Sequence, residues 1–168
     1  MKNDCKNILK KHAKSFYFAG LLLEKQTLND AAILYAFCRQ LDDAADSYDP
    51  DKSNELKNLI QDYRQPISLN SVNQSFKKIQ IKYGLKQKFI DDLISGVSSD
   101  TNFKQPQNLQ ELLLYSYQVA GTVGALMTRI LGANHQNAER FAIDLGIGMQ
   151  LTNISRDIKE DSLNNRIY

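Results

Sequence analysis

The stretch YAFCRQLDDAAD, residues 35–46, is the most informative part of the sequence, because it joins an apolar helix pattern to an unusual polar stripe. On a helix, residues three and four positions apart share a face, which aligns the side chains of Tyr35, Arg39, Asp42 and Asp46. Two carboxylates four residues apart repel each other and weaken the helix slightly. A divalent cation is the simplest group to offset that repulsion, and oxygen ligands select a hard cation such as Mg²⁺. A solvated acidic helix end is the alternative explanation.

A second polar stripe lies late in the chain, in QLTNISRDIKED, residues 150–161. At about 100° per residue, one helix face collects Gln150, Asn153, Asp157 and Asp161. Arg156 and Arg166 flank this stripe. Oxygen ligands beside guanidinium groups suit a magnesium-bound diphosphate, because the metal neutralises it and the guanidinium forks bind its free oxygens. An exposed helix of mixed charge explains Gln150 and Asn153 poorly, since both lie in an otherwise apolar segment.

We expect the two stripes to face each other across the core of a helical bundle and to ionise an allylic diphosphate. Magnesium would stabilise the leaving diphosphate by its charge. The carbocation left behind needs a dry cavity with apolar and aromatic walls. The aromatic side chains available for such walls are Phe16, Tyr17, Tyr35, Phe37, Tyr115 and Tyr117. Plain core packing is the alternative role for each of them.

Glycines mark the two late helical segments. Gly121 and Gly124 each cost a helix about 1 kcal/mol relative to alanine, and Gly146 and Gly148 repeat the pattern further on. Two explanations stay open at this point. Either another helix crosses closely at these positions, or an elongated ligand lies along the helix.

Length and periodicity favour one all-α domain over residues 1–168, a bundle of about seven helices. The expected helices span residues 3–14, 29 or 30 to 46, 52–63, 71–83, 86–97, 109–131 and 136–160. Ser15 is a candidate cap for the turn that follows the first helix. Gly84 and Gly132 are expected to end the helices before them, and residues 98–108 are expected to form a loop.

Composition excludes several classes of protein. The net charge of +2 gives no indication of nucleic-acid binding. The longest uncharged stretch, residues 112–128, is shorter than the roughly 20 residues of a membrane span and predicts a buried core helix. The charged start has no hydrophobic region of a signal peptide, which favours the cytoplasm. Cys5 and Cys38 are expected to be two free structural thiols in a reducing compartment.

These motifs together resemble the squalene/phytoene synthase family, the head-to-head trans-isoprenyl diphosphate synthases. The matching stretches are KSFYFAGLL, LYAFCRQLDDAAD, YQVAGTVGALM and LGIGMQLTNISRDIKED followed by NNRIY. A DDxxD motif is shared with chain-elongating prenyl synthases, whereas NxxRDxxxD after a VAGTVG helix is more particular to this family. The resemblance implies an isoprenoid-synthase-type all-α bundle around a central cavity.

The resemblance also implies an activity, which is the joining of two farnesyl or geranylgeranyl diphosphates through a cyclopropylcarbinyl diphosphate. The reaction would depend on Mg²⁺, with Mn²⁺ as a substitute, and on NADPH where the product is reduced to squalene. The prenyl chain length stays open, and so does the product, whether for carotenoid, sterol or hopanoid biosynthesis. A lipid product implies a cytoplasmic protein that associates peripherally with a membrane.

Residue roles follow from the same resemblance. The metal-handling positions it implies are Asp42, Asp46, Asn153, Asp157 and Asp161. The positions implied to contact diphosphate or prenyl chain are Lys14, Ser15, Phe16, Tyr35, Arg39, Gln150 and Arg156. The catalytic positions implied are the four aspartates Asp42, Asp46, Asp157 and Asp161, together with Tyr117, which would face the cation. Ala13 and Ser155 depart from the family pattern without removing an inferred metal ligand.

The resemblance further implies a chain that is shortened after Tyr168, since relatives continue through several more helices. A shortened bundle would expose apolar helix faces and self-associate through them. This leaves two alternatives to the synthase. One is a non-catalytic helical assembly or interaction protein of the same fold, and the other is a magnesium-dependent helical pyrophosphohydrolase.

Overall fold

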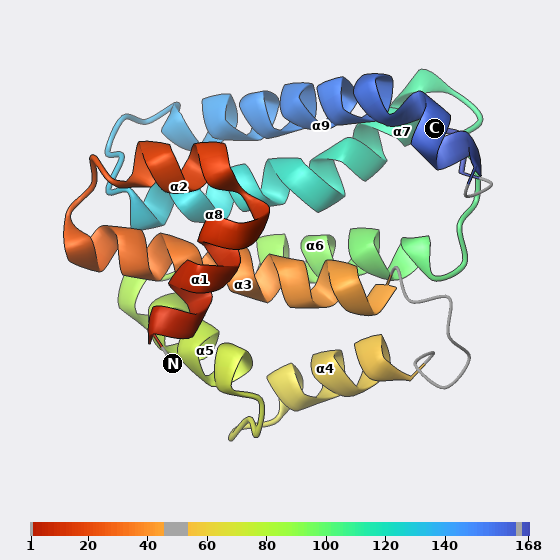
Figure 1. Cartoon of the computed structure of the whole chain (residues 1–168). Coiled ribbons are helices and arrows are strands. Elements are labelled where there is room, and N and C mark those ends of the chain that lie inside the picture. The colour runs from red at the N-terminus through yellow and green to blue at the C-terminus, as the bar shows by residue number, and fades with distance from the viewer. Residues whose placement is uncertain (1, 46–53, 164–165) are drawn as a thin grey trace. The chain divides into compact units, whose positions relative to one another are not determined.

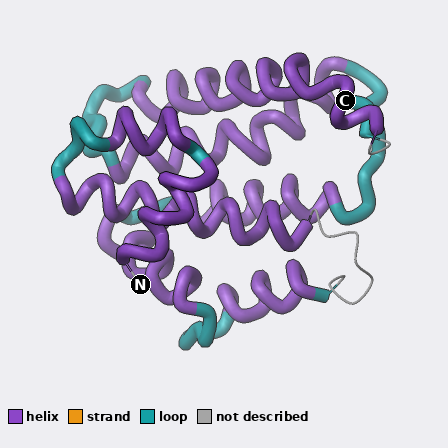
Figure 2. The backbone as a smooth tube through the Cα atoms, in the orientation of Figure 1, coloured by secondary structure: helices purple, strands orange, loops and turns teal. Residues whose placement is uncertain are grey.

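The structure is a computed structural model that describes residues 2–45, 54–163 and 166–168. In these ranges every regular element is helical, which confirms the all-α class (Figures 1 and 2). The chain divides into two compact units. The first ends at Leu85 and also includes Arg129–Gly132, and the second comprises Lys86–Thr128 and the residues from Ala133 onward. A single domain over residues 1–168 stays a prediction.

The first unit is built on a long helix, α3, and the shorter helices around it. Its helices are α1 (Lys2–His12), α2 (Lys14–Gly20), α3 (Lys25–Ala45), α4 (Glu55–Arg64) and α5 (Ser71–Tyr83). Three aromatic rings from three helices form its core: Phe37 stacks on Phe76 with centroids 3.8 Å apart, and Tyr63 tilts against Phe37 at 5.4 Å. These rings join α3 to α4 and α5, and α1 also packs against α3.

The start of α3 differs from the expectation. The helix begins at Lys25 and not at Asn29 or Asp30, so Asp30 lies inside it. The reason is that Asp30 has tertiary partners: its buried carboxylate accepts hydrogen bonds from Gln26, Lys82 and Tyr83 at 2.6–2.8 Å. A carboxylate with these partners ties the end of α5 to α3 and has no role as a helix cap.

The break between α1 and α2 was also placed incorrectly by the sequence pattern. The first helix ends at His12, and Ser15 is an exposed residue inside α2 that makes no cap. Ala13 supplies the break with φ −138° and ψ 65°, and its carbonyl accepts the first bond of α2 from the Tyr17 amide at 2.9 Å. Backbone geometry at Ala13 therefore replaces the expected side-chain cap.

The second unit contains the remaining helices. They are α6 (Gln87–Asp100), α7 (Leu109–Ser116), the π-helix η2 (Tyr117–Gly121), α8 (Thr122–Ile130), whose last two residues belong to the first unit, and α9 (Ala138–Leu163). The expected loop 98–108 is wrong in its first three residues, which continue α6 to Asp100. The expected single helix 109–131 is divided by η2, because a π-turn changes the hydrogen-bond register without interrupting the apolar pattern.

Other expectations are confirmed. Gly84 and Gly132 have positive φ angles of 58° and 70° and follow α5 and α8, as helix-ending glycines do. The residues of α6 expected to face inward, Phe89, Ile90, Leu93 and Ile94, are all buried. Both cysteines are free, and burial raises the pKa of the Cys38 thiol. In the described ranges no helix has the length and apolar character that a bilayer crossing needs.

The surroundings of the glycines in the second unit show which of them lie at a close helix crossing. A Cβ atom on Gly124 would lie 2.2 Å from the Ala142 carbonyl oxygen, and one on Gly146 would lie 2.5 Å from that of Ala120. Close crossing of α9 over η2 and α8 therefore explains both residues. A Cβ on Gly148 would have no neighbour within 4 Å, so helix crossing does not explain that glycine.

Candidate functional site

The first group of predicted site residues lies on α3, and we call Tyr35, Arg39 and Asp42 the α3 edge. All three side chains are half-buried. Burial raises the pKa of Tyr35, the charges of Asp42 and Asp43 raise it further, and Arg39 opposes them, so these groups lie within electrostatic reach of one another. Arg39 pairs with Asp43, its neighbour one turn on, at 2.6 Å. Asp46 lies outside the described residues.

One donor of the α3 edge has unused hydrogen-bonding capacity. In the part of the chain that the structure describes, the buried Nε–H of Arg39 has no hydrogen-bond acceptor. A buried donor left unpaired costs about 1–3 kcal/mol. In native proteins such a group is usually satisfied by an ordered water or by a ligand. The Nε–H of Arg39 is therefore a donor to which a ligand oxygen can bind.

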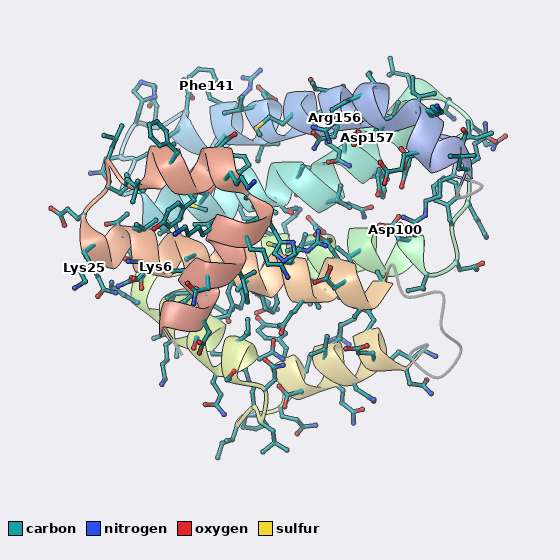
Figure 3. The ribbon with its side chains drawn as sticks, viewed as in Figure 1. Lys6, Lys25, Asp100, Phe141, Arg156 and Asp157 are labelled. Carbon is teal, nitrogen blue, oxygen red and sulfur yellow. The ribbon has the colours of Figure 1, made fainter. Side chains whose placement is uncertain are left out.

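The second group lies on α9, and we call Gln150, Asn153, Asp157 and Asp161 the α9 edge. All four side chains are half-buried, whereas Arg156 beside them is exposed. Figure 3 shows Arg156 and Asp157 together on α9, where Nε and Nη2 of the arginine donate to the two carboxylate oxygens at 2.7 and 2.6 Å. This fork lowers the pKa of Asp157 and keeps it ionised at neutral pH. The backbone carbonyl of Asp161 accepts a hydrogen bond from the Arg166 amide at 2.9 Å.

Tyr117 lies at the first position of η2, and its hydroxyl group is held by α6. The hydroxyl donates to Asp92 at 2.7 Å and accepts from Lys88 at 3.2 Å, while Lys88 and Asp92 pair at 2.7 Å. Burial and the Asp92 carboxylate raise the pKa of Tyr117, so it is a neutral phenol at physiological pH. The same carboxylate raises the pKa of Lys88 to about 12.

Sequence reasoning missed Lys88 and Asp92 as partners of Tyr117. The available signal was their spacing of four residues on an expected helix, which is typical of an ion pair. That spacing predicts the pair but not the third member, because Tyr117 is 25 residues further along the chain than Asp92.

The remaining predicted contacts belong to α2. Lys14, Ser15 and Phe16 are all exposed, and Phe16 keeps 57% of its surface accessible. The first unit therefore presents a cation, a hydroxyl group and an apolar ring on one short helix.

The oxygen ligands that the protein offers suit Mg²⁺ only if a bound ligand supplies the rest of the metal's coordination shell. Over the described ranges, no three or more His, Cys, Asp or Glu side chains gather closely enough to hold a metal ion. The α3 and α9 edges instead each offer carboxylate oxygens, and α9 adds amide oxygens. Mg²⁺ commonly takes one or two protein carboxylates and completes its shell with substrate phosphate and water. The residues present therefore fit a metal that arrives with a diphosphate.

Comparisons with known proteins identify the family of the chain. The family model described as squalene/phytoene synthase matches residues 9–168. The 15-cis-phytoene synthase of Enterobacter agglomerans is 32% identical over 93% of this chain and 57% of its own length. The crystal structure of a dehydrosqualene synthase in complex with ligand is 32% identical and superposes with a TM-score of 0.87 over 99% of this chain and 60% of that chain.

A third comparison concerns the fold alone. The squalene synthase HpnC from Alicyclobacillus acidocaldarius superposes with the same TM-score of 0.87 at 21% identity, over 99% of this chain and 65% of that chain. The helical arrangement is thus that of the isoprenoid synthases. The chain spans 57% of the length of that phytoene synthase, and 60% and 65% of the two solved structures.

Proposed function

Because the chain belongs to the squalene/phytoene synthase family, we propose that it carries the metal- and diphosphate-binding part of a prenyltransferase that joins two prenyl diphosphates head to head. The observation that carries the proposal is the donor set: both oxygen-rich edges are half-buried, and each has an arginine beside its carboxylates. This pairing of acceptors and guanidinium donors is what a magnesium diphosphate requires.

The carboxylates have the role of holding the metal in this proposal. Asp42 and Asp46 would do so on the α3 side, and Asn153, Asp157 and Asp161 on α9. When bound, Mg²⁺ neutralises the diphosphate and makes it a better leaving group. The low pKa of Asp157 keeps its carboxylate ready for this role at neutral pH.

The two arginines have the role of binding diphosphate oxygens. Arg39 has its unpaired Nε–H available for an oxygen, whereas the fork of Arg156 is engaged by Asp157. Binding of a cation by Asp157 would weaken this ion pair and free the Arg156 fork for a diphosphate. The metal and the diphosphate would therefore bind cooperatively, each with higher affinity in the presence of the other.

The substrate contacts complete the proposal. Lys14, Ser15, Gln150 and Tyr35 would contact the diphosphate, and Phe16 would contact a prenyl chain. Tyr117 would stay a neutral phenol and would stabilise the carbocation through the face of its aromatic ring. The substrates would be farnesyl or geranylgeranyl diphosphate, the intermediate a cyclopropylcarbinyl diphosphate, and NADPH would serve only a reductive second step. Peripheral membrane association would serve release of the lipid product.

The experiment that tests this function is a product analysis. The chain would be incubated with each prenyl diphosphate and Mg²⁺, with and without NADPH, and the lipids extracted and identified. A prenyl–prenyl product supports the synthase. Release of inorganic phosphate or diphosphate without such a product favours the pyrophosphohydrolase.

The non-catalytic interaction protein of the same fold is the alternative to this proposal. Calorimetry with magnesium pyrophosphate separates the two, because an interaction protein has no need of this ligand. A folded sample that gives no heat of binding would support the interaction protein of the same fold.

A further inference from the structure

Three side chains of the second unit that the site does not use join three separate segments, and we call Asp100, Tyr115 and Tyr168 the tyrosine clamp. The Tyr115 hydroxyl on α7 donates to the two carboxylate oxygens of Asp100, at the end of α6, at 3.1 and 3.2 Å. The ring of Tyr168 stacks on that of Tyr115 with centroids 5.2 Å apart, and their hydroxyl oxygens are 3.4 Å apart. Phe103 meets Tyr168 edge-on at 5.1 Å.

The hydrogen bond from Tyr115 to Asp100 is expected to persist at physiological pH. Burial strongly raises the pKa of Tyr115, and the charge of Asp100 adds to the effect. The phenol therefore stays protonated and remains a donor to the carboxylate. Aromatic pairs of this kind add about 0.5–1.5 kcal/mol beyond the area they bury.

The clamp continues into the α9 edge. Tyr168 lies two residues beyond Arg166, whose backbone amide donates to the Asp161 carbonyl at 2.9 Å. The charges of Arg166 and Asp161 both act on the pKa of Tyr168, so both groups are within electrostatic reach of its ring. Asp100 lies at the end of α6 (Figure 3). The segment after α9 thus has one attachment to Asp161 and another to the clamp.

We propose that the tyrosine clamp holds Arg166 beside Asp161 and so makes Arg166 a further diphosphate-binding group, with Asp100, Tyr115 and Tyr168 as positioning residues. This inference rests on the proposed function of the α9 edge. Without the clamp, the segment that carries Arg166 loses one of its attachments, and ordering that segment on each binding event lowers the affinity.

The attachment itself is tested without any ligand, by amide hydrogen exchange at Arg166. In Tyr168→Leu, which loses the stacking, the exchange of this amide should accelerate by about tenfold or more. Tyr168→Phe keeps the stacked ring and should exchange nearly as the wild type does. An unchanged Arg166 exchange rate in folded Tyr168→Leu would overturn the clamp.

The positioning role is tested by the affinity for magnesium pyrophosphate, measured by calorimetry well below the unfolding temperature. We expect Tyr168→Leu to bind about tenfold more weakly and Tyr168→Phe to retain most of the affinity. The control is Tyr83→Phe, which removes a tyrosine hydrogen bond of the first unit, to Asp30 at 2.8 Å, and leaves the clamp intact. Its affinity should equal that of the wild type.

The outcomes separate this inference from the proposed function. Wild-type affinity in Tyr168→Leu, or an equal loss in Tyr83→Phe, would overturn the positioning role. A wild-type chain that binds no magnesium pyrophosphate would instead overturn the proposed function, and the exchange rate of Arg166 would still decide whether the clamp exists.

Discussion

Asp30 lies inside α3, and its buried carboxylate accepts hydrogen bonds from Gln26, Lys82 and Tyr83. Burial alone would raise the pKa of Asp30, but these three donors outweigh it and lower the pKa below its ordinary value. The residue is therefore an ionised anchor for α3 and α5.

The variant Asp30→Asn should lower the free energy of unfolding at pH 7 by about 1–2 kcal/mol, because the buried bonds lose their charged acceptor. A lowered folded-state pKa means that the stabilisation is complete above the ordinary value of 3.8 and is lost as the pH falls through the lower folded-state value. The gap between the urea midpoints of wild type and variant should thus shrink as the pH falls below 3.8.

Asp91→Asn is the control for this prediction, since Asp91 is an exposed carboxylate on α6 that accepts only from Gln87 in the described hydrogen bonds. Its effect at pH 7 should stay within about 0.5 kcal/mol. A constant gap between wild type and Asp30→Asn from pH 7 to pH 3 would contradict the assignment.

Asp157 carries a prediction on binding. Asp157→Asn should abolish detectable binding of magnesium pyrophosphate, because the amide cannot serve as a charged metal ligand. Its thermal stability should change little, since exposed ion pairs such as that with Arg156 contribute little to folding. Calorimetry and thermal unfolding measure the two effects. Asp144→Asn, an exposed aspartate on the same helix, is the control and should bind as the wild type does.

At the scale of whole elements, the crossing of α9 over η2 and α8 is the feature that most constrains the second unit. Gly121, Gly124 and Gly146 lie where backbone or side-chain atoms of the other helix approach closely. The Gly121 Cβ position would lie 3.3 Å from a side-chain carbon of Ile143, and the other two positions are closer still to carbonyl oxygens. Small residues at a crossing let two helices approach more closely than larger side chains would allow.

Two alanine substitutions in α9 test this crossing. Gly146→Ala should destabilise the chain by about 1–3 kcal/mol, because the new methyl group meets the Ala120 backbone. Gly148→Ala should instead be neutral or stabilising by up to about 1 kcal/mol, because its Cβ meets no atom within 4 Å and alanine favours helix. Urea unfolding measures both. Equal effects of the two substitutions would show that the crossing is not close.

At the scale of the whole molecule, a helix pattern alone does not tell which apolar side chains are exposed to solvent. Phe141, Leu145 and Met149 follow one another at four-residue spacing on α9 and are 59%, 65% and 40% exposed. An apolar stripe of this kind favours association in water. Self-association of the chain therefore stays a prediction that the exposed residues support.

The double variant Phe141→Glu with Leu145→Glu should shift the chain toward the monomer, because like charges would replace the apolar stripe. Sedimentation velocity over a range of concentrations measures this shift. Ile81→Glu is the control, since Ile81 is 84% exposed but belongs to α5 in the first unit. Identical sedimentation of the double variant and the wild type would rule out association through this stripe.

Local pattern was sufficient for the helical class, for the limits of α5 and for the glycines that end α5 and α8. It also predicted two polar stripes, and their described residues are half-buried on α3 and α9. These features depend on residues three and four positions apart, and such residues share a helix face whatever the rest of the chain does. The same pattern placed the start of α3 four or five residues late and missed η2, because neither feature is encoded in apolar periodicity.

Partnerships between distant residues were decided only by the tertiary structure. Lys82 reaches Asp30 across 52 positions, and Tyr168 reaches Tyr115 across 53. The different surroundings of Gly146 and Gly148 likewise depend on where η2 crosses α9. The physical reason is that periodicity states which face a residue occupies, whereas its partner depends on how two faces are packed against each other, which no single segment determines.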